Sequence, residues 1–186
     1  MQIYSKWRHW LAPIAVVFGI AALLAIPSGT NAQDADEYSV KAEFLSRFPG
    51  FVTWPEAALG PKGAPFVIGV FGRDPIGRKL EDALKGKSGP GGRPFAVIRR
   101  RNSAALAGCP MVFVGGSEKA GAAGAIRALG RNTLVVGDWD GMARSGGSIG
   151  MGNAGGTISL TFNPGAASRA GLRLSSKLLR LGKTVR

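Results

Sequence analysis

Residues 138–181 read DWDGMARSGGSIGMGNAGGTISLTFNPGAASRAGLRLSSKLLRL, and this stretch decides the fold. Apolar and polar residues alternate over residues 157–162, which is typical of a strand with one buried face. Residues 149–152 alternate in the same way, with glycine at every second position. Between them, Asn-Ala-Gly-Gly at residues 153–156 tolerates the positive φ that a tight turn demands. The sequence therefore predicts an antiparallel hairpin.

A helix is expected directly after the hairpin. Asn163 is a suitable N-cap, and Pro164 suits the first helical position because its missing N–H costs nothing there. Apolar or small residues then recur at three- and four-residue steps, at Ala167, Ala170, Gly171, Leu174, Leu178 and Leu181. This spacing predicts a long C-terminal helix with one face toward the core.

The same stretch carries candidate partner-binding residues. A basic stripe separate from the apolar one contains Arg169, Arg173, Lys177 and Arg180. It is either a solvated face or a binding surface, since charge runs usually face water. Leu172 and Leu179 lie off both stripes. They form either an additional part of the core or a small contact patch. Trp139 at the start of a loop is either core or an interface anchor.

Further strands and helices alternate before the hairpin. Strands are expected at residues 66–72, 94–101, 111–114 and 133–138. Asp74 with Pro75 can begin a short helix that runs to Leu84, and residues 117–129 are an Ala-rich helix. Strands alternating with helices imply right-handed crossovers and a mostly parallel sheet. The predicted fold class is α/β, a three-layer sandwich of about six strands with the antiparallel hairpin at one edge.

An amphipathic helix should precede the first of these strands. Residues 37–54 place aliphatic and aromatic side chains at helical spacing. Pro49 and Gly50 fall inside this pattern and should end or kink the helix near Phe48. The remaining aromatic residues would pack as a turn.

Residues 1–32 have the pattern of a secretory signal peptide. Lys6 and Arg8 give a basic start, residues 11–26 are uncharged and mostly apolar, and small residues lead to a cleavage site after Ala32. The apolar run is shorter than the roughly 20 residues of a membrane span, so an uncleaved anchor is the alternative. Cleavage would leave residues 33–186, enough for one periplasmic α/β domain.

Composition restricts the classes of function. The formal net charge of +13 favours anionic partners. Export argues against nucleic acid as the partner. The aromatic residues also do not alternate with the basic ones, as they would on a surface that stacks bases. The single histidine, His9, lies in the signal peptide, which excludes Ser–His, Cys–His and His-ligated metal chemistry. Cys109 is the only cysteine, so no intrachain disulfide can form. We expect no enzyme, no metal and no cofactor.

One ligand-binding alternative remains. Ligands of open α/β sheets bind beyond the carboxyl ends of the strands, where this sequence places Gly72, Arg73, Asp74 and Ser117. Glycines before a helix N-terminus can hold an anion, so a small ligand or polyanion could bind there. The simpler interpretation is that Gly72 forms a tight turn and Asp74 caps a helix.

Several motifs together resemble one family. They are VKAEFL with the later Trp54-Pro55, GRDPIG after the first strand, and the closing FNPGAASRAGLRLSSKLL. In this order, from about Tyr38 to Gly182, they resemble the YfiR family of exported proteins.

The resemblance implies a periplasmic regulator with the α/β fold inferred above, present as a homodimer. YfiR-like proteins bind the periplasmic sensor domain of YfiN, an inner-membrane diguanylate cyclase, and hold it inactive. YfiB, an outer-membrane lipoprotein, can sequester the repressor, so that cyclic-di-GMP signalling and biofilm respond to the envelope. An equivalent role is expected for this chain, with a YfiN-like and a YfiB-like partner.

The chain departs from the family pattern at two places. Redox-sensitive members carry paired cysteines, whereas only Cys109 is present here, so control by intrachain disulfides is not expected. Pro49-Gly50 stands where many relatives have a continuous helix.

Overall fold

A seven-stranded sheet in the order β3-β2-β4-β5-β6-β7-β9 is the middle layer of the structure. The structure is a computed structural model that describes the backbone of residues 30–186 and the side chains of residues 37–186. The strands are β2 (Phe66–Phe71), β3 (Phe95–Arg100), β4 (Met111–Val114), β5 (Leu134–Gly137), β6 (Ile149–Ala154), β7 (Thr157–Phe162) and β9 (Lys183–Thr184). Only the β6–β7 pair is antiparallel in this sheet. The predicted mostly parallel sheet with a C-terminal hairpin is confirmed, but β9 and not the hairpin forms that edge, and the sheet has seven strands instead of about six.

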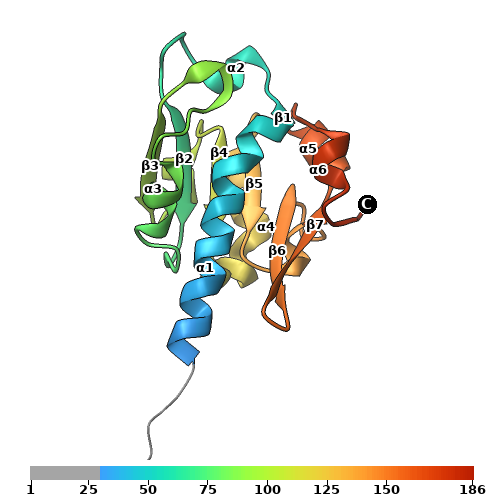
Figure 1. The fold of residues 1–186 in the computed structure, drawn as a ribbon. Helices are drawn as coiled ribbons and strands as arrows, with labels where there is room; N and C mark the ends of the chain where they lie inside the picture. The colour runs from blue at the N-terminus through green and yellow to red at the C-terminus, as the bar shows by residue number, and fades with distance from the viewer. Residues whose placement is uncertain (1–29) are drawn as a thin grey trace, which may run out of the picture. The chain divides into compact units, whose positions relative to one another are not determined.

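Helices cover both faces of the sheet. They are α1 (Thr30–Arg47), α2 (Glu56–Leu59), α3 (Lys79–Leu84), α4 (Ala122–Leu129), α5 (Pro164–Arg169) and α6 (Ser176–Leu179), with 3₁₀ turns η1 (Phe48–Phe51), η2 (Pro90–Gly92), η3 (Ser103–Leu106), η4 (Gly116–Gly121) and η5 (Asp140–Met142). In Figure 1, α1 crosses one face of the sheet and α4 lies behind the other. The three-layer α/β sandwich predicted from the alternation of strands and helices is therefore confirmed.

The sheet separates two clusters of buried apolar side chains. Ile68 and Val70 of β2 face a cluster that also contains residues of α1, α3, α5 and α6. Phe71 and Val112 face the other cluster, which contains residues of η3, α4 and η5. Successive residues of a strand point to opposite faces, so near-continuous apolar runs such as β2 are explained by burial on both sides.

The N-terminal helix ends where the sequence predicts. α1 stops at Arg47, and Pro49 lies in the 3₁₀ turn η1 that follows. The indole N–H of Trp54 donates to the carbonyl of Pro49 at 3.0 Å, which holds the aromatic turn against the helix end. Most of the predicted signal peptide lies outside the described residues. Within residues 30–186, no helix is both long and apolar enough to span a bilayer.

The long C-terminal helix is the part of the prediction that is wrong. α5 ends at Arg169, and Gly171 has a φ of +83°, which breaks the helix. The chain then forms β8 (Arg173–Leu174), which pairs antiparallel with β1 (Val52–Thr53). Ser175 caps α6 by accepting a hydrogen bond from the Leu178 N–H at 3.2 Å. Short elements thus bury Leu174 and Leu178, as the helix was expected to do, whereas Leu181 is 57% exposed.

Candidate functional site

The predicted ligand site at the ends of β2 and β4 is filled by side chains. The Arg73 N–H donates to Ser117 Oγ at 3.1 Å, and Ser117 Oγ donates to Glu118 Oε1 at 3.0 Å. A Cβ on Gly72 would lie 2.3 Å from Glu118 Cγ. The structure therefore brings Gly72, Arg73 and Ser117 together, but Glu118 occupies the space that an anion would need.

Asp74 has a structural role different from the predicted one. Its Oδ1 accepts from the N–H groups of Ile76 at 3.0 Å and Gly77 at 2.9 Å, and α3 begins only at Lys79. Its Oδ2 accepts from Arg99 Nε at 2.5 Å. Asp74 therefore stabilises a turn before the helix and an ion pair with the edge strand, and it does not cap α3.

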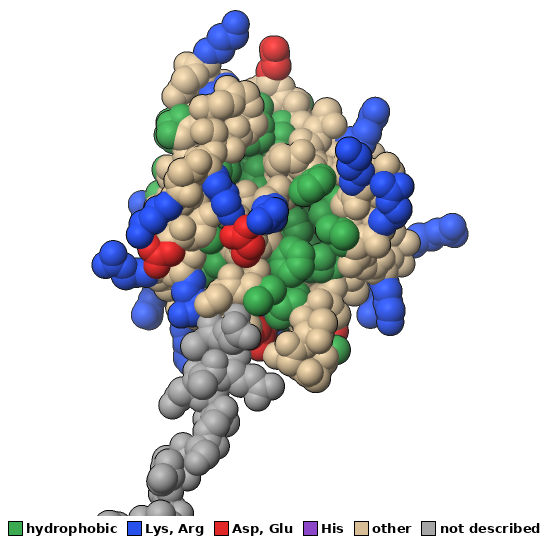
Figure 2. Space-filling view, in the orientation of Figure 1, with side chains coloured by type: hydrophobic (Ala, Val, Ile, Leu, Met, Phe, Trp, Pro, Cys, Tyr) green, Lys and Arg blue, Asp and Glu red, His purple; other side chains and the backbone are tan. Residues whose placement is uncertain are grey.

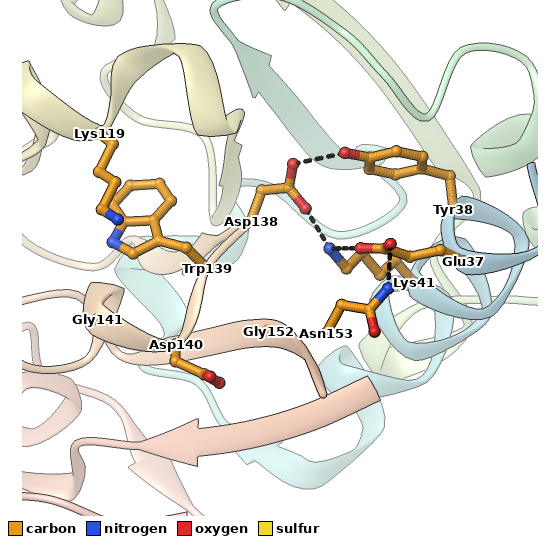
Figure 3. A pocket seen from close by; sticks show the side chains of 10 residues that line it. All are labelled: Glu37, Tyr38, Lys41, Lys119, Asp138, Trp139, Asp140, Gly141, Gly152 and Asn153. Atoms are coloured by element: carbon orange, nitrogen blue, oxygen red, sulfur yellow. Dashed lines mark hydrogen bonds and ion pairs between the residues drawn. The ribbon is translucent and has the colours of Figure 1, made fainter. Parts of the chain in front are cut away.

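A pocket lies instead at the end of β5, beneath α1. Its volume is about 340 Å³. The lining comes from α1 (Glu37, Tyr38, Lys41), from η4 (Lys119), from the segment after β5 (Asp138, Trp139, Asp140, Gly141) and from β6 (Gly152, Asn153). Figure 3 shows Asp138, Lys41 and Glu37 pointing toward one another, and Lys119 standing beside the Trp139 ring. Trp139, predicted as core or interface anchor, is half-buried here.

A buried ion-pair cluster forms one wall of this pocket. The Lys41 side chain is 2% exposed, and its Nζ lies 2.5 Å from Asp138 Oδ1, whose side chain is 5% exposed. Lys41 also pairs with Glu37, one helical turn before it. The Tyr38 hydroxyl donates to Asp138 Oδ2 at 3.0 Å. Because a buried charge is tolerated only when it is paired, this cluster fixes α1 to the end of β5.

Glu37 connects the cluster to the hairpin. Asn153 Nδ2 donates to Glu37 Oε2 at 2.5 Å. Burial alone would raise the pKa of the Glu37 carboxyl, but the hydrogen bonds from Lys41 and Asn153 outweigh burial and lower that pKa. Glu37 is therefore an anion at neutral pH.

Asp140 lies on the opposite side of the pocket. Ser159 Oγ donates to Asp140 Oδ1 at 2.6 Å, and the carboxylate rests against Gly152, where a Cβ would lie 2.2 Å from Oδ1. No ion pair joins Asp140 to any described cation. The pocket thus offers a carboxylate without an ion pair, on the side away from the Trp139 ring in Figure 3, and this carboxylate can accept a hydrogen bond from a cationic group.

The pocket does not have the arrangement of an acid–base pair. Asp138 is held by Lys41 and Tyr38, while Asp140 points away from Asp138 in Figure 3. Among the described residues, no group of three or more His, Cys, Asp or Glu side chains could hold a metal ion.

Sequence reasoning missed most of this pocket. Lys41 falls on the apolar stripe of α1, at helical spacing from Leu45 and Phe48, which are both buried. A lysine on a buried helix face requires a carboxylate partner, and Asp138 follows a buried strand. The sequence thus contains both the lysine on a buried helix face and the aspartate after a buried strand. No local pattern, however, indicates that α1 crosses β5 and brings the two together.

The predicted partner-binding residues lie on separate C-terminal elements. Arg169 ends α5, Arg173 is in β8 and Lys177 is in α6, and all three are exposed. Leu172 is 3% exposed and belongs to the core, so it cannot form a contact patch. Leu179 is half-buried against the core. Because the helix is broken, the cations do not form one helical stripe, although they remain accessible.

These cations belong to a C-terminal segment without acidic residues. Asp140 is the last acid in the chain, and the cations that follow it are Arg144, Arg169, Arg173, Lys177, Arg180, Lys183 and Arg186. All are exposed, and none forms an ion pair with a described residue. We name the last six of them the C-terminal basic surface. Figure 2 shows basic side chains projecting from the side that carries α5 and α6 in Figure 1.

Cys109 is a buried free thiol, in agreement with its interpretation as a small hydrophobe. It is 7% exposed, and burial raises its pKa. A protonated, buried thiol is unreactive, so it does not contribute to a site.

Residues 38–183 match a protein-family model described as YfiR/HmsC-like. No curated protein shows a significant match to the chain. Among solved structures, the chain is similar to a conserved domain protein from Vibrio cholerae O1 biovar El Tor strain N16961, with a TM-score of 0.50 and 14% identity. The match covers 80% of this chain and 60% of that one, and at this identity it shows the fold alone.

Proposed function

Because the chain belongs to the YfiR/HmsC-like family, we propose that it is a periplasmic regulator that represses an inner-membrane signalling enzyme. It would bind the extracytoplasmic sensor domain of a YfiN-like diguanylate cyclase and lower cyclic-di-GMP, and a YfiB-like outer-membrane lipoprotein would compete for it. The protein would be exported, cleaved after Ala32 and act as a homodimer without a cofactor. The family is regulatory and periplasmic, which supports this role over catalysis.

The observation that carries the proposal is the C-terminal basic surface. Arg169, Arg173 and Lys177 are exposed and form no ion pair with a described residue. Such cations remain available to an acidic face on a sensor domain. Complementary charge would speed the encounter between the two proteins more than it tightens the complex.

Repression follows from a difference in affinity between two states of the target. A regulator that binds the inactive sensor state about 3 kcal/mol more tightly than the active state shifts their ratio more than a hundredfold. No contact with the catalytic domain is required, because the equilibrium of the sensor carries the signal.

The test is complementation in a strain of the native host that lacks this protein. We expect deletion to raise the cyclic-di-GMP level. Expression of the wild-type chain should lower it again. The triple variant R169E/R173E/K177E should accumulate and fold but fail to restore repression. Crosslinking followed by mass spectrometry should recover an inner-membrane protein with a cytoplasmic signalling domain from wild type only.

The matched control is K62E/R127E/R131E, which reverses three exposed cations elsewhere and produces the same change in net charge. It should repress normally. Equal loss in both variants would mean that overall charge matters and not this surface. Repression by a folded R169E/R173E/K177E variant would refute the role of these residues.

The pocket supports a second candidate function, the binding of a small periplasmic ligand. Its Asp140 carboxylate, which has no ion pair, suits a cationic or zwitterionic molecule. Screening such molecules by thermal shift should find one that stabilises the wild type but not Asp140→Asn. Glu56→Asn, which removes an exposed carboxylate outside the pocket, is the control and should respond like wild type.

A further inference from the structure

One edge of the large sheet is formed by β3 alone. Among the described strands, β3 pairs only with β2, and its six residues are half-buried or exposed. Figure 1 places β3 at one margin of the sheet. At six residues this edge is long compared with β9, the two-residue strand at the other end. A long edge strand can pair with a strand from another chain.

The register shows which backbone groups of β3 are free. The Phe66 N–H donates to the Pro94 carbonyl at 2.8 Å, and the Gly72 N–H donates to the Arg100 carbonyl at 3.1 Å. In a parallel pair, alternate residues direct both backbone groups toward the neighbouring strand. Even-numbered residues of β3 therefore face β2, and odd-numbered ones, with Val97 at the centre, direct their N–H and C=O groups outward. Of these outward groups, the Arg99 carbonyl already accepts a hydrogen bond from Arg100 Nη1 at 2.8 Å.

A groove runs beside this free edge. It has a volume of about 420 Å³. Leu84, Phe95 and Val97 give it apolar walls, and Lys85 and Lys87 line it as well. Phe95 and Val97 thus supply both the outward backbone groups and the groove wall. A strand added to β3 would place side chains of one face directly into the groove.

The charge around the edge selects the kind of partner. Arg100 and Arg101 at its carboxyl end are exposed and form no ion pair with a described residue. Glu81, an acid of the groove, is already paired with Arg99. A second copy of this chain would bring the two basic edges together, whereas an acidic segment would complement them. A charged edge can also serve only to prevent aggregation, but that role does not require a groove.

We propose that the β3 edge binds an extended segment of a partner protein by strand addition. Apolar side chains of that segment fill the groove over Val97, and acidic side chains near one of its ends meet Arg100 and Arg101. This surface is separate in sequence from the C-terminal basic surface and does not depend on the function proposed above.

The test uses a displayed library of random octapeptides, selected on the full chain. Enriched peptides should alternate apolar with polar residues and carry acids near one end. For a synthetic enriched peptide, Val97→Pro should weaken binding about tenfold or more, because it removes an outward N–H and blocks the adjoining hydrogen bonds. The β2–β3 ladder should survive, since the lost N–H faces away from β2.

Two controls keep the outcome clear even if Val97→Pro folds poorly. The same peptide N-methylated on the residues that face β3 should not bind the wild type, whereas methylation at the alternate residues should leave binding intact. In hydrogen exchange, the peptide should protect the amides of Val97 and Arg99.

Failure to enrich peptides of this pattern would overturn the proposal. So would equal binding of both methylated forms, or protection confined to another part of the chain. A wild-type dimer that Val97→Pro converts to monomer would assign the edge to a second copy instead, and would equally overturn it.

Discussion

Residues 37–140 and residues 141–186 use charge in different ways. In the first region, Lys41, Arg47, Lys85, Lys87 and Arg99 all hold carboxylates in ion pairs. In the second region there is no acid, and the cations are exposed. Three of the paired cations of the first region, Lys41, Lys87 and Arg99, connect a helix to another element, although other cations of this region are exposed and form no ion pair with a described residue. The second region is held by glycine turns, side-chain caps and buried leucines, so its cations are not required for folding and remain available for recognition.

The largest effect should come from breaking the buried pair of the first region. Lys41→Met leaves Asp138 buried without its cation, and losing one partner of a buried pair costs about 3–5 kcal/mol. Lys177→Met in the second region should change the free energy of unfolding by less than about 0.5 kcal/mol. Urea unfolding of both variants measures the difference. Similar values would show that the two regions do not differ as described.

The second largest effect should come from acid, which should destabilise the ion pairs of the first region. Hydrogen bonds from Lys87 and Arg47 lower the pKa of Glu43, and that from Arg99 lowers the pKa of Glu81. A lowered folded-state pKa contributes stability that is present above the unfolded-state pKa and is lost as pH falls through the folded-state value. The free energy of unfolding should therefore decline below about pH 5.

The second region has no carboxylate side chain to titrate, so among residues 37–186 the side chains that lose negative charge in acid all belong to the first region. The variant E43Q/E81Q should have lower stability at pH 7 and a smaller further loss in acid. Thermal unfolding from pH 7 to pH 3 measures both quantities. An acid transition unchanged in E43Q/E81Q would mean that other carboxylates control it.

In the second region, a change in backbone conformation should lower the free energy of unfolding more than a change at an exposed cation does. Gly171 has a φ of +83°, and a Cβ there would lie 3.1 Å from Asn132 Oδ1. Gly171→Ala should cost about 1–2 kcal/mol, because a side chain disfavours this conformation. Gly165→Ala, within α5, should be close to neutral or stabilising. Urea unfolding compares the two. Equal costs would show that the turn at Gly171 is not what breaks the predicted helix.

These two regions also mark what the sequence could predict about the fold. Strand periodicity, the glycines of the hairpin and the Asn163 cap are local signals, and each gives the observed element. The broken helix was harder, because leucines at three- and four-residue steps suit one helix or several short elements. Gly171 and Ser175 were the signals for a break. The break allows β8 to pair with β1, and this pairing joins residues that are distant in sequence.

The site was less predictable than the fold. The strand-end prediction named Gly72, Arg73 and Ser117, and these do meet, but Glu118 fills the space between them. The pocket depends on α1 crossing the end of β5, which only tertiary packing determines. The exposure of Arg169 was predictable because a cation needs a partner or water, whereas the burial of Leu172 follows from a turn that periodicity does not reveal.

The smallest effect on stability should come from the cations of the second region. Reversing Arg169, Arg173 and Lys177 to Glu removes no ion pair and lowers the repulsion within a chain of net charge +13. The free energy of unfolding should change by less than about 1 kcal/mol, with the sign toward stabilisation at low salt. Urea unfolding at two salt concentrations measures it. If the triple variant instead unfolds several kcal/mol more easily, its cations support the fold, and a loss of repression in cells would no longer indicate a lost contact.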